Sequence, residues 1–516
     1  MKSDKSFLLA ILVAALALVS CSGVPKGGGG GGGGNTADVS LVMVSDTLPA
    51  NIGIVSFVVT INSVQLTSST GVQTNLALNG GKGITVDLAR LQSDSAFLGT
   101  VTGVPTGTNS SITLSFGTTA KLAFYNGTGA TITSLNPTCA PGQVCAATYT
   151  VVGTPTITAS QTISGNTGIG IDFNLANSLV LSGTSLSINL TNSGNNNVVS
   201  SFSLPRTNSN LSAGQLDLIE DFTGVVTLGS PGVTITSDAS DGRGSIAASS
   251  ATGTVYDQDP TQSYCPGGTT SLSGCVTTNG AASMDAILNS DGTFTVREIE
   301  PLLHTLQDTV EGTVVYINPN NQTQFDIVTT DIIPAATSSK IGTLGLGDPI
   351  TMTLSNVIAN GFYVDTKGLP VASLAPASYN DFFGQTTTSA IHPGQSVAVH
   401  ITSFTAASGT TPASANTDSV TLRWSRFIAS PVAPSSNTLF NLNSLPGYFG
   451  FTQASVFQVQ SFMGTQGAPG VTNLDGIAPQ NGPATPTPPV GVRALYLQNA
   501  TNNANPAFVA AKVRQH

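Results

Sequence analysis

Few side chains in this sequence of 516 residues could carry out acid–base or metal chemistry. Histidine occurs four times, and His392 and His400 form the nearest pair along the chain. Both flank one expected turn and strand, and their separation exceeds a metal ion's reach unless the chain folds back. We therefore expect two solvated histidines at strand ends, with His304 and His516 standing alone. The chain has no Gly-x-Ser-x-Gly elbow, no His-Glu-x-x-His motif and no phosphate-binding Gly-Lys-Ser/Thr loop. These patterns predict no enzymatic activity and no cofactor.

The densest acidic group could bind calcium through carboxylate oxygens. It comprises Asp238, Asp241, Asp257 and Asp259. Oxygen ligands at such spacing can hold calcium in extracellular β proteins, but the full calcium-loop pattern is missing. Asp241 is followed by glycine, which also favours an ordinary hairpin turn. The turn is the preferred interpretation, and a calcium site stays open as the alternative.

Trp424 is the only tryptophan and could provide a stacking platform for sugars if it were exposed. In an extended strand, Leu422 and Trp424 share one face while Arg423 and Ser425 share the other. An apolar neighbour on its own face favours burial, so we expect Trp424 in a core.

Cys21 has the most informative neighbours of the five cysteines. Lys2 and Lys5 form a basic start, and an apolar run over residues 7–19 leads to Leu18-Val19-Ser20-Cys21. The run is too short to span a bilayer but suits a signal peptide. Its end resembles the lipobox of bacterial lipoproteins, in which the cysteine thiol takes a diacylglycerol and becomes the first mature residue. An ordinary secretory signal and a short membrane anchor are the alternatives.

Residues 21–37 are expected to form a flexible tether, because residues 27–34 are an unbroken run of glycine. Ser22 follows the cysteine, which resembles an outer-membrane address. No later segment has an uninterrupted apolar run long enough to span a bilayer.

The other four cysteines lie in two local pairs, Cys139 with Cys145 and Cys265 with Cys275. An exported chain passes through an oxidising compartment, where such pairs usually become disulfides. Four cysteines allow three connectivities, and we expect the local one. A zinc site with four thiolates is the rival interpretation, but zinc ligands usually come in more closely spaced pairs. We therefore expect no bound metal.

The composition predicts an all-β protein with a neutral surface. Charged residues make up 8% of the chain and hydrophobic residues 40%, and the formal net charge is −10. Removal of residues 1–20 takes away two lysines and one aspartate, so the mature charge becomes 14 − 25 = −11. Such an acidic balance does not suit phosphate binding, so we expect no nucleic-acid partner. Thr, Val, Ile and Phe favour strands, and Gly, Asn and Asp favour turns.

Alternating apolar residues predict a β-sandwich over residues 38–203, with a bulge near Asn62-Ser63 where the inward face changes parity. A single helical turn is expected near residues 86–91. This region resembles a bacterial lipoprotein family described as domain of unknown function 4382, on residues 39–41, Asp46, 58–66, 86–92 and 171–174. The resemblance implies location and architecture, since the family carries no established activity.

The remainder resembles three diverged copies of one small β-barrel, at residues 215–300, 301–430 and 431–516. Each copy is expected to open on a glycine-led hairpin, at residues 224–235, 312–328 and 447–459. Each closes on a strand that mixes apolar and charged residues, at 294–299, 422–427 and 508–513. The pattern is similar to the repeats described as domain of unknown function 5666.

These expectations together describe a non-catalytic envelope lipoprotein, anchored in a membrane, most simply the outer membrane, through an N-terminal lipid. It would serve as a scaffold or as a module that binds an envelope protein. A glycan-binding adhesin is the alternative, and a row of exposed aromatic residues on one barrel face would favour it. An extracytoplasmic hydrolase ranks third and would need a cleft that gathers a carboxylate pair or the two histidines.

Overall fold

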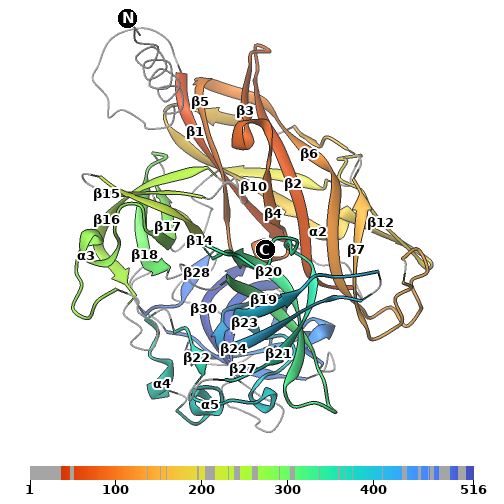
Figure 1. Ribbon diagram of the computed structural model, residues 1–516. Coiled ribbons are helices and arrows are strands. Elements are labelled where there is room, and N and C mark those ends of the chain that lie inside the picture. Colours follow the sequence, from red (N-terminus) through yellow and green to blue (C-terminus); the bar gives the residue numbers. More distant parts are fainter. Residues whose placement is uncertain are drawn as a thin grey trace, which may run out of the picture. The chain divides into compact units, whose positions relative to one another are not determined.

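The computed structural model describes residues 36–515 (Figure 1), with gaps at 47–51, 136, 152, 159, 195–196, 204–214, 230–231, 238–243, 258–264, 290, 303–307, 336, 358–360, 367, 375, 410, 433–437, 451–454, 463, 465–469, 476–488 and 498–506. The fold is all-β, as the composition predicts. None of the helices within these residues is long and apolar enough to cross a membrane. Several residues discussed above lie outside the described residues: Cys21 with the signal and tether, Asp238, Asp241, Asp259, His304 and His516.

Two sheets form the N-terminal sandwich. The first has the strand order β13-β10-β1-β5, with bounds Val199–Ser203, Thr167–Asn174, Thr36–Asp46 and Ala96–Pro105. The second follows β3-β2-β6-β7, with β4 on β2 and with β8 and β9 on β6. Its bounds are Gln73–Ala77, Ile52–Ser68, Gly107–Asn126, Val144–Thr150, Ile84–Asp87, Thr156–Ile157 and Gln161–Ile163. Smaller elements are α2 (Leu175–Ser178), the hairpin β11–β12 (Leu179–Ser182, Ser185–Ile188), η1 (Leu78–Gly81) and η2 (Arg90–Gln92).

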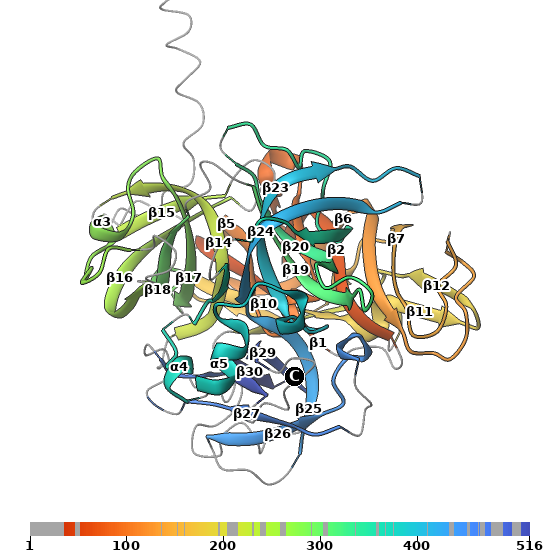
Figure 2. The same cartoon turned by 60° about the horizontal axis from the view of Figure 1, so that its bottom comes forward.

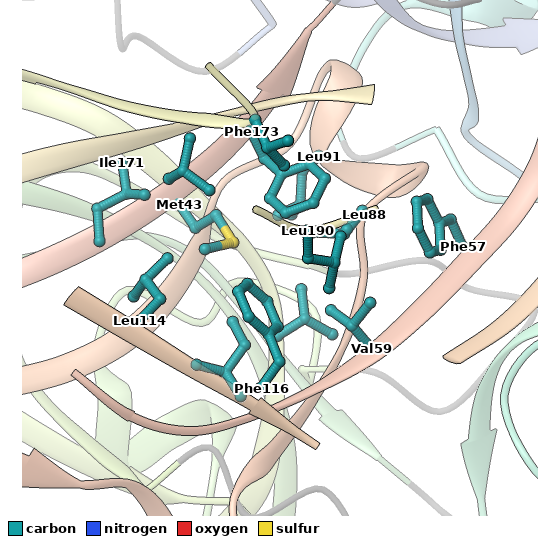
Figure 3. Packing of buried hydrophobic residues seen from close by; sticks show 14 of the residues in the cluster. Met43, Phe57, Val59, Leu88, Leu91, Leu114, Phe116, Ile171, Phe173 and Leu190 are labelled. Carbon is teal, nitrogen blue, oxygen red and sulfur yellow. The ribbon is translucent and has the colours of Figure 1, made fainter. Parts of the chain in front are cut away.

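Apolar side chains from both sheets fill the sandwich core (Figure 3). The ring of Phe173 on β10 lies edge-on to Phe57 and Phe116 of the opposite sheet, with centroids 6.3 and 6.2 Å apart. The predicted bulge is confirmed, because the register of β2 against β6 shifts between Ile61 and Ser63. The extra residue reverses which side chains face inward, and so both halves of the long strand contribute to one core.

Three five-stranded rings follow the sandwich. In chain order their strands are β14 to β18, then β19, β20, β21, β23 and β24, and last β25, β26, β27, β29 and β30. The first ring has bounds Gln215–Leu228, Gly232–Thr236, Ser245–Tyr256, Ala281–Asn289 and Phe294–Leu302. The second has Asp308–Ile317, Gln324–Ile333, Pro349–Leu354, Ser396–Thr405 and Ala413–Arg423. The third has Ser425–Val432, Leu439–Asn443, Phe457–Gln460, Val490–Tyr496 and Phe508–Gln515. We call these rings barrels 1, 2 and 3.

All three barrels share one topology. Numbered within a barrel, the first strand pairs with the second and fourth, and the third pairs in parallel with the fifth. This ring order, 1-2-3-5-4, with one parallel pair, is that of the five-stranded Greek-key barrel called the OB-fold.

The barrels differ in the elements inserted between their strands. Barrel 1 contains α3 (Leu272–Cys275). Barrel 2 contains β22 (Phe362–Val364), α4 (Val371–Leu374), α5 (Pro376–Phe382) and η3 (Thr388–Ala390), and barrel 3 contains η4 (Gly447–Phe449) and β28 (Asn473–Asp475).

The opening of barrel 3 differs from the sequence-based prediction. Barrel 3 opens on β25, so only Trp424 separates it from barrel 2, and the division falls before residue 430. The hairpin predicted at residues 447–459 is wrong, because Gly447 starts the 3-10 turn η4 instead. A Cβ on Gly447 would lie 2.3 Å from the ring of Tyr125. This glycine therefore permits a close approach to the sandwich, a role that local sequence does not distinguish from a strand start.

Each barrel touches the sandwich. The rings of Phe97 on β5 and Phe294 on barrel 1 have centroids 5.0 Å apart. Lys121 on β6 forms an ion pair of 2.6 Å with Asp348 of barrel 2. Together with the approach of η4 to β6, these contacts join each of the three barrels to the sandwich, and Figure 2 shows the four folded units from a second side.

Candidate functional site

Charged side chains from the sandwich and all three barrels meet in one buried group, which we call the junction cluster. Its side chains are at most 16% exposed, and burial of charge on this scale is costly unless each charge is paired. The members are the five arginines Arg90, Arg423, Arg426, Arg493 and Arg514, and the eight carboxylates Asp94, Asp221, Asp285, Glu300, Glu311, Asp331, Asp365 and Asp475.

Asp221 lies at the centre of the junction cluster. It sits on β14 at a shift in register with β17, with φ of +50°, a left-handed conformation that Asp adopts more readily than most residues. Its backbone N–H donates to Asp285 at 2.8 Å. Its carboxylate accepts hydrogen bonds from Arg90 at 3.1 Å, from Arg493 at 3.4 Å and from Arg426. One carboxylate of barrel 1 thus binds the sandwich and barrel 3.

The sandwich contributes through the short segment that follows β4. The carboxylate of Asp87 accepts hydrogen bonds from the backbone of Phe57 and Ala89, at 2.8 and 3.0 Å, and from the hydroxyl of Ser56 at 2.7 Å. Burial raises the pKa of Asp87 in spite of these bonds. They fix the chain just before η2 (Arg90–Gln92), close to the helical turn predicted near residues 86–91.

Arg90 and Asp94, at the two ends of this segment, reach different barrels. Arg90 donates to the carbonyl of Thr330 at 3.1 Å and lies 3.8 Å from the carboxylate of Asp331, both on barrel 2. Asp94 accepts a hydrogen bond from Arg426 on barrel 3. The segment from Arg90 to Asp94 therefore links the sandwich to barrels 2 and 3. Arg90 also binds Asp221 of barrel 1.

Arg423, the last residue of β24, joins barrels 1 and 2. Its guanidinium pairs with Asp365 and, at 3.5 Å, with Glu311, both within barrel 2. It also lies 3.7 Å from Glu300 on β18 of barrel 1. The planar fork of arginine suits such simultaneous pairing with several carboxylates.

Arg514 on β30 closes the arrangement from the C-terminal strand. Its side chain is fully buried, and Nε donates to Asp475 at 2.7 Å. The other two nitrogens bind the sandwich: the carbonyls of Leu91 and Asp94 at 3.1 and 2.6 Å, and the hydroxyl of Ser95 at 2.7 Å. The last strand of the chain is thereby fastened to the segment around η2.

The electrostatics favour the ionised form of two carboxylates of the cluster, Asp94 and Glu311. Burial alone would raise the pKa of Asp94, but Arg426 and Arg493 hold it below its ordinary value. Burial likewise opposes ionisation of Glu311, yet Arg423 and other guanidinium groups lower its pKa. Both carboxylates therefore stay ionised near pH 7, paired with guanidinium groups. The arrangement is suited to joining domains.

A small cavity with a mixed polar and apolar lining borders the junction cluster between the sandwich and barrel 2. Its volume is about 60 Å³, and Arg90, Asp94 and Asp331 contribute to its wall. Among the described residues, the buried hydroxyl of Thr330, a residue that also lines the cavity, has no hydrogen-bond partner. A cavity of this size has room for a few water molecules.

Most of the lysines and arginines within the described residues are largely buried. Among the described residues outside the cluster, Arg297 and Lys512 are also largely buried, which leaves Lys82, Lys121 and Lys340 near the surface. Binding to nucleic acid needs several exposed cations that neutralise phosphates. The described surface offers no such group.

His392 and His400 do not contact one another in a shared site, because each has its own hydrogen-bond partner. His392 Nδ1 lies 2.8 Å from the carbonyl of Pro393, while His400 Nδ1 lies 3.0 Å from the hydroxyl of Ser419. The expectation of solvated rings is wrong, since both are half-buried, and burial lowers the pKa of each. His400 lies in the middle of β23 and not at a strand end, whereas His392 lies just before the turn that precedes this strand.

Other candidate residues are placed as follows. Trp424 is 1% exposed, so its predicted burial is confirmed. Cys139 and Cys145 form one disulfide, and Cys265 and Cys275 form the other, which agrees with the expected local pairing. Asp257 is buried at the end of β16; of the four candidate calcium ligands it alone lies within the described residues, which contain no cluster able to hold a metal ion.

Sequence patterns indicate closing strands that mix apolar and charged residues. They do not show that these charges meet in the junction cluster. A sharper signal was available in β29, where Arg493 follows Val490-Gly491-Val492 and precedes Ala494-Leu495-Tyr496. A charge inside a wholly apolar strand predicts a buried ion pair. Sequence alone does not name the partners, because they lie far away along the chain.

Comparison with protein-family models, with curated proteins and with solved structures found no match.

Proposed function

We propose that this protein is a non-catalytic envelope lipoprotein, held on the outer membrane by a lipid on Cys21 and acting as a scaffold or interaction module. The observation that supports the proposal is the junction cluster. It uses a large share of the chain's charges to tie the sandwich to three barrels. A body of this kind presents fixed surfaces at a distance from its anchor.

Two further features agree with this role. The exposed surface is dominated by neutral side chains, which can form many weak contacts but supply little preorganised electrostatic stabilisation for a transition state. The OB topology is compatible with many functions and does not by itself select one.

A glycan-binding adhesin remains the alternative and would need a row of exposed aromatic side chains on one barrel. Within the described part of the chain, Tyr316 on β19 is the only aromatic residue among the exposed large hydrophobic side chains, at 49% exposure. This single side chain does not form a stacking platform, so the scaffold is the better supported proposal.

One experiment can measure lipid anchoring, contact with a partner and enzymatic turnover together. The full chain is expressed in a Gram-negative host with a photoreactive residue in place of Tyr316, with and without Cys21→Ser. We expect palmitate labelling, outer-membrane fractionation and a cross-link to one defined envelope protein, all lost with Cys21→Ser. A cross-link to polysaccharide would favour the adhesin instead. Turnover of ester, peptide, phosphate or glycoside reporters that is lost in His392→Ala or His400→Ala would contradict the proposal.

A further inference from the structure

We propose that the junction cluster is an acid-sensitive joint: when its carboxylates take up protons, the sandwich and the barrels separate while each keeps its own fold. This inference concerns the folded body alone and does not depend on the lipid anchor or on the scaffold role.

The distribution of charge makes acid selective for this joint. Acid acts on groups that titrate, and only 8% of the residues are charged. Eight of the 26 acidic residues belong to the junction cluster. The cores of the sandwich and of the barrels are instead built from apolar side chains. Apolar contacts also cross the boundaries, since Phe97 packs into the core of barrel 1 and Val55 into that of barrel 3, so acid acts on the charged part of each boundary.

Asp221 is the group whose protonation matters most. Its carboxylate pairs with guanidinium groups from the sandwich and from barrel 3, which stay charged because arginine does not lose its proton at accessible pH. The charged groups around it are the cations Arg90, Arg423, Arg426 and Arg493 and the acids Asp94, Asp285 and Glu311. Neutralising these acids leaves buried cations that repel one another and lack partners, a state that costs far more than the pairs contribute when formed.

The direction of the shifts sets the pH range. The pKa values of Asp94 and Glu311 are lower in the folded protein than their ordinary values, so their stabilising effect is fully present above about pH 4. It is lost as the pH falls through the lower folded values. Asp87 acts in the opposite sense, because burial raises its pKa and protonation then favours the folded state. The joint should accordingly open below about pH 4.

The folded units have means of support that acid does not remove. Backbone ladders close each barrel, from β14 to β30. Disulfides hold Cys139 to Cys145 in the sandwich and Cys265 to Cys275 in barrel 1. Hydrogen bonds between backbone groups and covalent bonds between sulfurs do not titrate in this range.

A small cavity lies beside the cluster. The cavity lined by Arg90, Asp94 and Asp331 lies between the sandwich and barrel 2, at the surface along which the two would part. Thr330 also lines this space, together with apolar side chains such as Val86 and Leu346, so polar and apolar groups meet at this point.

The single tryptophan reports on the joint. Trp424 is buried between the two arginines Arg423 and Arg426, and its carbonyl accepts a hydrogen bond from Arg426 at 3.0 Å. The full chain in detergent is titrated from pH 7 to pH 3 and followed by Trp424 fluorescence, far-ultraviolet circular dichroism and small-angle scattering. We expect a red-shifted emission and a larger radius of gyration below about pH 4, with the strand signal retained and full reversal on neutralisation.

Two variants sharpen the test. Asp221→Asn keeps the shape but removes the central charge, so the fluorescence transition should move upward by at least about one pH unit. Asp291→Asn, at an exposed turn of barrel 1, is the matched control and should leave the midpoint unchanged. In the unmodified chain, simultaneous loss of the fluorescence and dichroism signals would overturn the proposal, and so would a constant emission down to pH 3. Equal shifts of the midpoint in the two variants would also overturn it. The titration of the unmodified chain decides the question if Asp221→Asn does not fold.

Discussion

The core of the sandwich and the junction cluster are both buried but are built from opposite chemistry. In the sandwich, rings such as Phe57 and Phe173 interlock, and their stabilisation depends on removing apolar area from water. In the junction cluster, guanidinium and carboxylate groups lose their hydration water and pair with one another instead. Removing these charges from water carries a large desolvation cost. Loss of a side chain from the first interior leaves a cavity, whereas loss of a partner from the second leaves a buried charge unpaired. Apolar burial builds each unit and also crosses the boundaries, and the charged pairs are concentrated where the units meet.

The largest effect should follow from removing one arginine. Arg426→Met keeps most of the volume but leaves Asp94 and Asp221 with fewer partners in a buried site. We expect a loss of about 3–5 kcal/mol in the unfolding free energy of the transition seen by Trp424 fluorescence, measured in urea at pH 7. An unchanged urea midpoint would show that the cluster does not hold the units together.

A core substitution should cost nearly as much but should respond differently to pH. Leu114→Ala removes a fully buried side chain from the sandwich, for an expected loss of about 2–5 kcal/mol. Because no charge is involved, the loss should be equal at pH 7 and pH 5, as followed by circular dichroism in urea. A cost that depends on pH would mean that core and cluster are not separate systems.

The exposed ion pair should have the smallest effect. Lys121 and Asp348 link the sandwich to barrel 2, but their side chains are 38% and 30% exposed. We expect Lys121→Met to lower the free energy of unfolding by less than about 1 kcal/mol, and we expect even this effect to vanish at high salt. A loss comparable to that of Arg426→Met would indicate that exposed charges join the units as strongly as buried ones.

The elements were easier to predict than their assembly. Alternation of apolar residues located the hairpins at Val225 and Val314, and a change of parity located the bulge in β2. These features are set by neighbours along the chain. The opening of barrel 3 was mispredicted because the glycines around η4 serve a contact with Tyr125, which is distant in sequence.

The candidate site depended still more on distant contacts. Arg514 donates to the carbonyl of Asp94 across 420 positions of sequence, and Arg90 reaches Asp221 across 131. Local patterns show that these charges interrupt apolar strands, which indicates burial. They do not show which opposite charge each one meets, since the pairing is a property of how four folded units pack.

The most direct test of the account is a double-mutant cycle between Arg90 of the sandwich and Asp221 of barrel 1. Urea unfolding at pH 7 is followed by Trp424 fluorescence in the unmodified chain, Arg90→Met, Asp221→Asn and the double variant. The account expects a coupling free energy above about 1 kcal/mol, because the two groups pair in a buried site. Additive effects of the two substitutions, within about 0.3 kcal/mol, would contradict it.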